Sequence, residues 1–255
     1  MKALLLTVLV IYLTYAVVLV VLHPRFIYPF LSDDRVLAGF ERVELTASDG
    51  EKLFVQVRAA PGPVVLYFMG NAGSLSLFQP AFDPHIAAGR HIVALEYRGG
   101  AGRPGHPSER VLKADALVAA DFARTLGKPV VVQGFSLGTG LALHVGARRD
   151  VDRVILTAPY DRLCHLMATR AWLPACVLPF VQKWNALRDA QQVAAPALVL
   201  HGDRDQLIPP QRSMAYEALP NVKRLLISGA GHNDIAEFDA YSRAMAEFLQ
   251  PLVSN

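Results

Sequence analysis

The chain has 255 residues, of which 53% are hydrophobic and 18% charged, and its formal net charge is +3. This length allows one large α/β domain or two small ones with a sizeable core, and the composition excludes a disordered chain. Because Lys and Arg residues are scattered among acidic ones, we expect no nucleic-acid partner.

The chain opens with an uncharged apolar run from Ala3 to Leu22. As a helix, this run would span about 30 Å, the thickness of the hydrocarbon core of a bilayer. We therefore predict a transmembrane anchor over residues 1–22 and a single-pass membrane protein. A cleaved signal peptide is the alternative, although its apolar region is usually only about 7–15 residues long.

Positive charges lie on both sides of this run, with Lys2 before it and Arg25 and Arg35 after it. A two-residue positive head most simply stays in the cytoplasm, so we expect the rest of the chain on the non-cytoplasmic side, the periplasm in a bacterium. Residues 23–41 are predicted to be a juxtamembrane linker. Its aromatic residues suit the membrane interface but could equally dock on the following domain.

Residues 42–255 have the pattern of one α/β domain. An antiparallel hairpin turns at Asp49-Gly50, and apolar strands then alternate with helical segments. This alternation predicts a mostly parallel sheet with helices on both faces. The expected strands are 42–48, 52–58, 64–69, 91–97, 130–132, 154–157, 197–201 and 222–228, and the later helices are 108–126, 211–219 and 239–249.

The alternation is interrupted at about residues 159–192, where Pro174 and Pro179 break helical pieces. We interpret this insertion as a short helical lid over the carboxyl edge of the sheet. The two cysteines of the chain, Cys164 and Cys176, lie in it. They permit an oxidising compartment without requiring one, and we expect two free buried thiols rather than a disulfide.

The segment that organises the domain reads VVVQGFSLGTGL, from Val130 to Leu141. A buried β-branched strand leads directly into the pattern G-x-S-x-G around Ser136. A tight turn between strand and helix holds such a serine clear of the sheet, as a nucleophile requires, and Gly134 and Gly138 leave room for it. Ser136 is therefore the predicted nucleophile.

A nucleophilic serine needs a base and an orienting acid at the ends of later strands. Asp203 and Asp205 follow the strand at 197–201, and His232 follows the strand at 222–228 in a Gly-rich loop. The order of Ser136, an aspartate and His232 is that of the α/β-hydrolase arrangement.

Five segments carry a resemblance to a known family: FMGNAG (68–73), YRGGAG (97–102), GFSLG (134–138), HGDRDQLIP (201–209) and GAGH (229–232). The chain resembles the α/β-hydrolase superfamily from about residue 43 to residue 249, in particular its serine aminopeptidase-like, Bem46-type membrane-anchored hydrolases. The resemblance implies an α/β-hydrolase fold. Its HG-x-x-D pattern assigns the acid to Asp205 and leaves Asp203 to cap the loop. The family commonly has histidine where Met69 stands.

An oxyanion in this arrangement needs backbone donors. We assign them to the N–H of Leu137, which follows the nucleophile, and to the N–H of Asn71, in the loop after the strand at 64–69. The apolar lid residues could line an acyl pocket or simply pack on the core. We place substrate contacts at Met69, Phe135, Leu173 and Phe180.

One motif suggests a cofactor. Residues 100–105 match G-x-G-x-x-G after a strand, but Pro104 and Pro107 delay the helix that a dinucleotide would need, so a solvent loop is the better interpretation. Without a P-loop, an H-E-x-x-H motif or a cysteine cluster in the sequence, we predict no cofactor and no metal.

We therefore expect a monomeric, membrane-anchored serine hydrolase that cleaves an ester or thioester, possibly of an acyl chain, through an acyl-enzyme. Its partners would be a small-molecule or acylated substrate and the membrane. A serine peptidase on small peptides, or a catalytically idle binding scaffold with this fold, are the alternatives.

Overall fold

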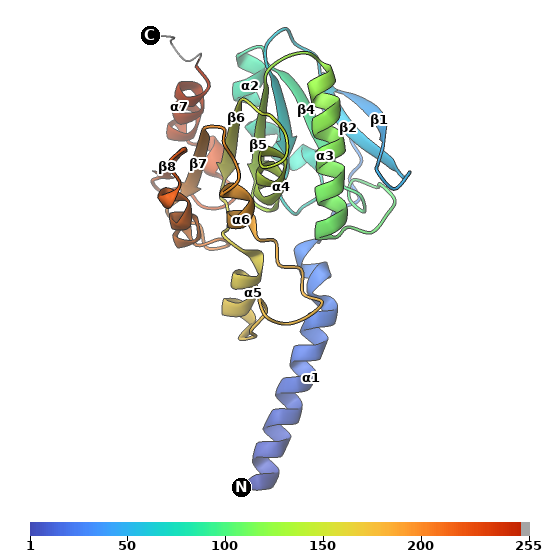
Figure 1. The fold of residues 1–255 in the computed structure, drawn as a ribbon, viewed down its shortest axis with the longest axis vertical. Coiled ribbons are helices and arrows are strands. Elements are labelled where there is room, and N and C mark those ends of the chain that lie inside the picture. The colour runs from blue at the N-terminus through green and yellow to red at the C-terminus, as the bar shows by residue number, and fades with distance from the viewer. Residues whose placement is uncertain (251–255) are drawn as a thin grey trace.

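A single eight-stranded sheet forms the centre of the molecule (Figure 1). The computed structural model describes residues 1–250. The strand order is β1-β2-β4-β3-β5-β6-β7-β8, and all neighbours are parallel except β1–β2 and β2–β4. The strands are β1 (Glu41–Thr46), β2 (Lys52–Arg58), β3 (Val64–Phe68), β4 (His91–Glu96), β5 (Val130–Phe135), β6 (Arg153–Thr157), β7 (Ala197–Gly202) and β8 (Val222–Ile227).

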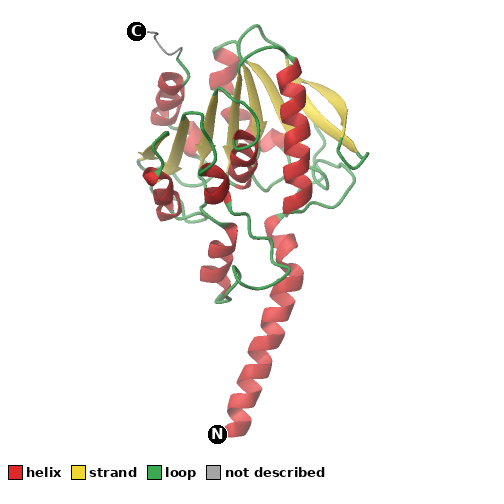
Figure 2. Ribbon diagram, viewed as in Figure 1, coloured by secondary structure: helices red, strands yellow, loops and turns green. Residues whose placement is uncertain are grey.

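Helices cover both faces of this sheet (Figure 2). The α-helices of the domain are α2 (Asp83–Ala87), α3 (Glu109–Thr125), α4 (Leu137–Gly146), α5 (Leu163–Ala171), α6 (Ala186–Ala190) and α7 (Asp239–Phe248), and the 3₁₀ helices are η1 (Leu75–Ala81), η2 (Pro210–Ala218) and η3 (Ile235–Glu237). The predicted fold class, a mostly parallel sheet opened by an antiparallel hairpin, is confirmed.

The helix predicted at 211–219 differs, because η2 is a 3₁₀ helix. The Ser213 hydroxyl donates to the carbonyl of Pro210, three residues earlier, and so competes with an α-helical pattern.

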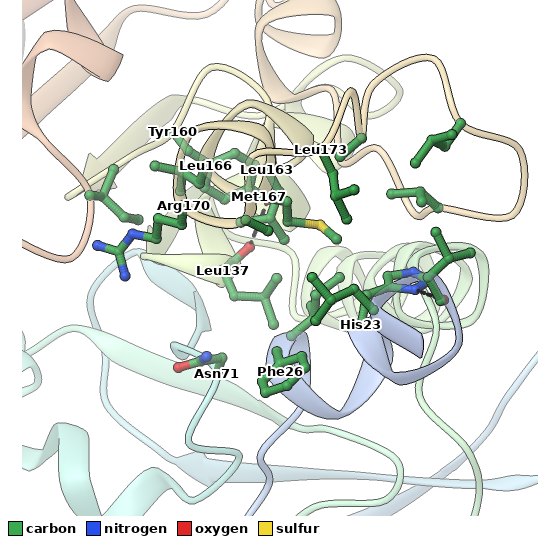
Figure 3. Close-up of a pocket in the computed structure, with 18 of the residues that line it drawn as sticks. His23, Phe26, Asn71, Leu137, Tyr160, Leu163, Leu166, Met167, Arg170 and Leu173 are labelled. Carbon is green, nitrogen blue, oxygen red and sulfur yellow. Dashed lines mark hydrogen bonds between the residues drawn. The ribbon is translucent and has the colours of Figure 1, made fainter. Parts of the chain in front are cut away.

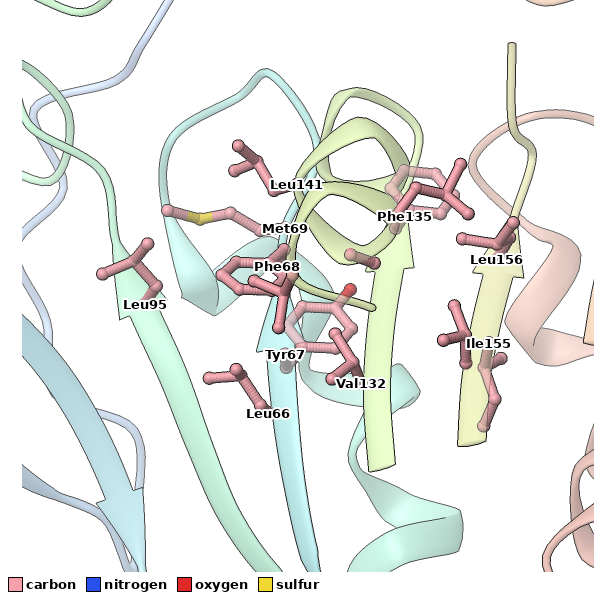
Figure 4. Packing of buried hydrophobic residues seen from close by; sticks show 14 of the residues in the cluster. Leu66, Tyr67, Phe68, Met69, Leu95, Val132, Phe135, Leu141, Ile155 and Leu156 are labelled. Carbon is pink, nitrogen blue, oxygen red and sulfur yellow. The ribbon is translucent and has the colours of Figure 1, made fainter. Parts of the chain in front are cut away.

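Strand β5 lies in the middle of the sheet between β3 and β6, and all six of its residues are buried. Parallel strands covered on both faces need continuous apolar sequence, which explains the valine run. Figure 4 shows Val132 packed among Leu66, Ile155 and other core side chains, with Leu141 of α4 above them. The end of β5 is therefore a rigid platform.

The N-terminal helix α1 (Lys2–Ile27) is longer than the predicted span, ending at Ile27 instead of Leu22. Pro24 lies inside it and has no N–H to donate to the carbonyl of Val20. The Nδ1 of His23 donates to that carbonyl instead, at 2.6 Å, so the turn keeps its hydrogen bond. Of the described helices, α1 alone is long and apolar enough to cross a membrane.

The remainder of the segment predicted as a linker lies on the domain. The backbone N–H of Leu31 donates to Ala72 O at 2.8 Å, and that of Leu37 donates to Gln56 Oε1 at 2.9 Å. Tyr28 is buried and its ring meets Phe30 at 5.5 Å, while Phe26 is exposed. Of the two roles left open for these aromatic residues, Tyr28 and Phe30 take the docking role.

The lid contains α5, α6 and the loop between them, and it carries a disulfide. Cys164 and Cys176 are bonded, with their Cα atoms 5.0 Å apart, so the expectation of two free thiols is wrong. Helix α5 ends at Ala171, and the chain then reverses direction at Pro174. Cys176 therefore lies next to Cys164, near the start of the helix. The sequence alone does not show this reversal.

Candidate active site

Ser136 occupies a strained turn between β5 and α4. Its φ is +51°, a value rare for residues other than glycine. A Cβ on Gly134 would lie 2.4 Å from the carbonyl oxygen of Gly138, and a Cβ on Gly138 would lie 2.1 Å from that of Phe68. Both glycines are therefore sterically required for the turn that presents the Ser136 hydroxyl.

Three side chains from three strand ends meet at this turn. His232 Nε2 lies 3.0 Å from Ser136 Oγ, and His232 Nδ1 lies 2.7 Å from Asp205 Oδ2. Because a carboxylate only accepts hydrogen bonds, Nδ1 carries the proton and Nε2 is free to accept the hydroxyl proton. The residues are 96 and 27 positions apart in the sequence, and the order of parallel strands brings them to one edge.

The surroundings of Asp205 favour its charged form. Burial alone would raise the pKa of this carboxyl group, but hydrogen bonds with His201, His232 and the backbone N–H of Ile208 outweigh burial and hold the pKa well below its usual range. Asp205 Oδ1 accepts the N–H groups of Leu207 and Ile208, both at 2.8 Å. The carboxylate is thus fixed and ionised beside the imidazole.

His201 was assigned no role in the sequence analysis. It is fully buried, and its Nε2 lies 2.8 Å from the carbonyl of Ile208 and 3.3 Å from Asp205 Oδ2. It therefore fixes the loop that carries the acid. Its place at the start of the HG-x-x-D pattern was the available signal.

Asp203 lies in the same loop with a different task. Its Oδ1 accepts the N–H of Gly229 at 2.8 Å, which ties the loop after β7 to the loop after β8. It makes no contact with His232 among the described hydrogen bonds.

The two residues predicted to supply oxyanion donors line the same cavity as the serine. Leu137 is the first residue of α4, and N–H groups in the first turn of a helix have no intrahelical acceptor and lie at its positive end. Asn71 follows β3 and faces the same cavity as Ser136 and Leu137 (Figure 3).

Comparison with known proteins places this geometry in a family context. The chain is 29% identical to an uncharacterized protein of Mycobacterium tuberculosis, over 81% of this chain and 77% of that protein. It is 28% identical to the alpha/beta hydrolase domain-containing protein 17C of Mus musculus, over 87% and 70% of the two chains. The alpha/beta hydrolase domain-containing protein aho-3 of Caenorhabditis elegans is 26% identical, over 91% and 71%.

The fold agrees with that of solved structures. An esterase of Pyrococcus furiosus superposes with a TM-score of 0.69 at 20% identity, covering 82% of this chain and 91% of the esterase. A putative non-heme bromoperoxidase of Mycobacterium tuberculosis superposes with a TM-score of 0.60 at 21% identity, covering 77% and 94%.

The chain has the α/β-hydrolase fold, and it is similar in sequence to proteins named alpha/beta hydrolase domain-containing. No protein-family model matches it. The sequence relatives named alpha/beta hydrolase domain-containing proteins support a hydrolase.

Two cavities flank Ser136 and His232. The larger, about 530 Å³, touches Ser136 and Leu137 and has mostly apolar walls from α1 and the lid. Figure 3 shows His23 and Phe26 of α1 across the cavity from Leu163, Met167 and Leu173 of the lid. The N-terminal helix therefore forms one wall of the site, which the sequence analysis did not anticipate.

The second cavity, about 460 Å³, lies on the His232 side. Phe135 lines it beside Gln133 and Thr157, and Asn71 borders both cavities. Ser136 therefore lines the larger cavity, and His232 lines the smaller one.

The four predicted substrate contacts fall in different places. Leu173 lines the larger cavity and Phe135 the smaller one. Met69 is completely buried in the core, with its carbonyl bonded to the Tyr97 hydroxyl, and lines neither cavity. Phe180 is 89% exposed and also lines neither. Within residues 1–250, no group of three or more His, Cys, Asp or Glu residues is arranged to hold a metal ion.

Proposed function

We propose that this protein is a membrane-anchored serine hydrolase that cleaves an acyl ester or thioester through an acyl-enzyme. The observation that carries the proposal is the relay from Ser136 Oγ to His232 at 3.0 Å and from His232 to Asp205 at 2.7 Å. These are hydrogen-bond distances suited to proton transfer between nucleophile and base.

In the first half of the reaction, Ser136 Oγ attacks the substrate carbonyl while its proton passes to His232 Nε2. Asp205 stabilises the resulting imidazolium. The N–H groups of Leu137 and Asn71 stabilise the charge on the former carbonyl oxygen. His232 then protonates the leaving oxygen or sulfur, the bond to the acyl carbon breaks, and an acyl-serine remains.

In the second half, a water molecule gives a proton to His232 Nε2 and attacks the acyl carbon. The ester bond to Ser136 breaks, the imidazolium returns the proton to Ser136 Oγ, and a carboxylic acid is released. The mostly apolar cavity on the serine side suits the acyl chain. The cavity on the His232 side suits the leaving group, which must receive its proton there.

We infer that α1 is retained as an anchor for the hydrolase domain at residues 42–255. It supplies Leu19, Val20 and His23 to the wall of the larger cavity. Cleavage after residue 22 would remove part of that wall. The disulfide supports a domain on the non-cytoplasmic side, because disulfides persist in oxidising compartments.

A fluorophosphonate probe tests the proposed chemistry. We expect it to label the wild-type protein and not Ser136→Ala, while both proteins show the same thermal unfolding. A well-folded wild type that resists labelling would instead support an idle scaffold. Activity on p-nitrophenyl esters of increasing chain length, compared with aminoacyl anilides, separates an acyl hydrolase from a peptidase.

A further inference from the structure

The tip of the lid, residues 171–181, is an apolar surface. Its sequence, AWLPACVLPFV, contains no charged residue, and the charged Arg170 and Lys183 stand on either side of it. Trp172 is 85% exposed, Val177 is 79% exposed and Phe180 is 89% exposed. The surfaces of soluble proteins rarely gather large apolar side chains in this way. The lid tip is therefore a candidate for contact with an apolar environment outside the protein.

The position of the lid tip along α1 identifies that environment. The hydroxyl of Tyr12 donates to Trp172 O at 3.0 Å, and that of Tyr15 donates to Ala171 O at 3.1 Å. Tyr12 lies ten residues before the end of the apolar run at Leu22, or about 15 Å along a helix. That is about half of the hydrocarbon thickness of a bilayer. Figure 1 shows α5 beside α1, projecting from the domain along that helix.

Several backbone groups of the lid tip already have hydrogen-bond partners within the protein. In hydrocarbon every carbonyl needs a partner within the protein. The hydroxyls of Tyr12 and Tyr15 donate hydrogen bonds to two of these carbonyls. Lys183 Nζ donates to the carbonyls of Ala175 and Leu178, at 3.1 and 2.6 Å. The N–H of Ala175 donates to Leu173 O at 2.7 Å. These bonds satisfy backbone groups of the lid tip within the protein, while the side chains of Trp172, Val177 and Phe180 face outward.

We propose that the lid tip at residues 171–181 is a second membrane-embedded segment, lying in the acyl-chain region of the bilayer beside α1. The larger cavity is lined by both α1 and the lid, so an acyl chain enters it directly from the bilayer and meets Ser136 at its inner end. This proposal rests on the membrane anchoring proposed above. It adds the source of the substrate, which is a lipid-embedded acyl chain.

Fluorescence tests the location of the lid tip without using catalysis. The chain has two tryptophans, the exposed Trp172 and the completely buried Trp184. We expect phospholipids brominated in the middle of their acyl chains to quench the full-length protein in vesicles and not Trp172→Phe. Ser136→Ala should be quenched like the wild type, so failure of the proposed chemistry would leave this result intact.

Two outcomes of that experiment would overturn the proposal. Vesicle flotation that leaves the protein behind would overturn both the anchor and the embedded lid. Flotation with the vesicles, combined with quenching of Trp172 by aqueous iodide and not by brominated lipid, would overturn the embedded lid alone.

A charge on the lid tip tests the route of the substrate. A lysine in hydrocarbon is strongly unfavourable, so we expect Val177→Lys to reduce hydrolysis of a long-chain ester embedded in vesicles by about tenfold or more. Its activity on a soluble short-chain ester should be unchanged, because Val177 lines neither cavity. Met214→Lys is the control, since Met214 is 53% exposed on η2. Equal activity of Val177→Lys and this control on the embedded ester would refute the route.

Discussion

The hydroxyl of Tyr12 donates a hydrogen bond to the backbone carbonyl of Trp172, 160 residues further along the chain. The bond joins the N-terminal helix to the lid. His23 joins them again where the helix meets the domain, because its Nε2 accepts the N–H of Gln182 at 3.1 Å. The N-terminal helix and the lid therefore form one unit around the larger cavity.

Removal of both tyrosine hydroxyls should loosen this unit. In the double variant Tyr12→Phe, Tyr15→Phe, we expect the contact between α1 and the lid to lose about 0.5–1.5 kcal/mol of stabilising free energy per hydrogen bond. Faster hydrogen exchange in residues 171–181 would report the loss. Thr14→Val is the control, since the Thr14 hydroxyl donates only to Val10 O within the same helix. Unchanged exchange in the double variant would contradict the coupling.

The assignment of the acid distinguishes two neighbouring aspartates. Asp205→Asn removes the charge that holds the His232 tautomer, and we expect the rate to fall by about 10⁴. Asp203→Asn keeps an oxygen that can accept the N–H of Gly229, so its rate should stay close to that of the wild type. Hydrolysis rates of the two purified variants test this assignment. If Asp203→Asn were the slower variant, Asp203 would be the acid instead of Asp205.

The disulfide should stabilise the lid. Its cysteines are 12 positions apart, and closing a loop of this size is worth about 3 kcal/mol in the chain-entropy model. We expect the double variant Cys164→Ser, Cys176→Ser to be cleaved faster by trypsin after Arg170. Reductant should speed this cleavage in the wild type and leave the variant unaffected. A wild type insensitive to reductant would mean that the bond does not protect the lid.

Asp189 should make stability depend on pH. Burial alone would raise its pKa, but His144, Lys113 and Arg148 hold the pKa well below its usual range. A lowered pKa contributes stability that is fully present above the unfolded value of about 3.9, and this contribution is lost progressively as pH falls from there through the lowered folded value. Asp189→Asn should therefore be less stable than the wild type at pH 7, and the gap should be narrower at pH 3.

Urea unfolding of both proteins at the two pH values measures this difference. Asp152→Asn is the control, because Asp152 is a partly exposed residue paired loosely with Arg153 at 3.6 Å. A gap between wild type and Asp189→Asn that is as large at pH 3 as at pH 7 would contradict the linkage.

The local elements of the domain could be predicted from the sequence. The valine run of β5, the hairpin at Asp49-Gly50 and the G-x-S-x-G turn have periodicities and turn residues that fix their own conformation. The mostly parallel pairing also followed from the alternation of strands and helices, whereas the order of the strands came from the structure. Ser136, Asp205 and His232 could be selected in advance because each ends such a strand.

Features that depend on contacts between distant segments could not be predicted, because they arise when the chain folds. The helix continues through Pro24 because a side chain replaces the missing donor, and Cys176 meets Cys164 because the chain reverses at Pro174. The apolar run of α1 is uniform in sequence, so nothing in it marks which face lines a cavity. That face is set by packing against the lid, which involves residues about 150 positions away.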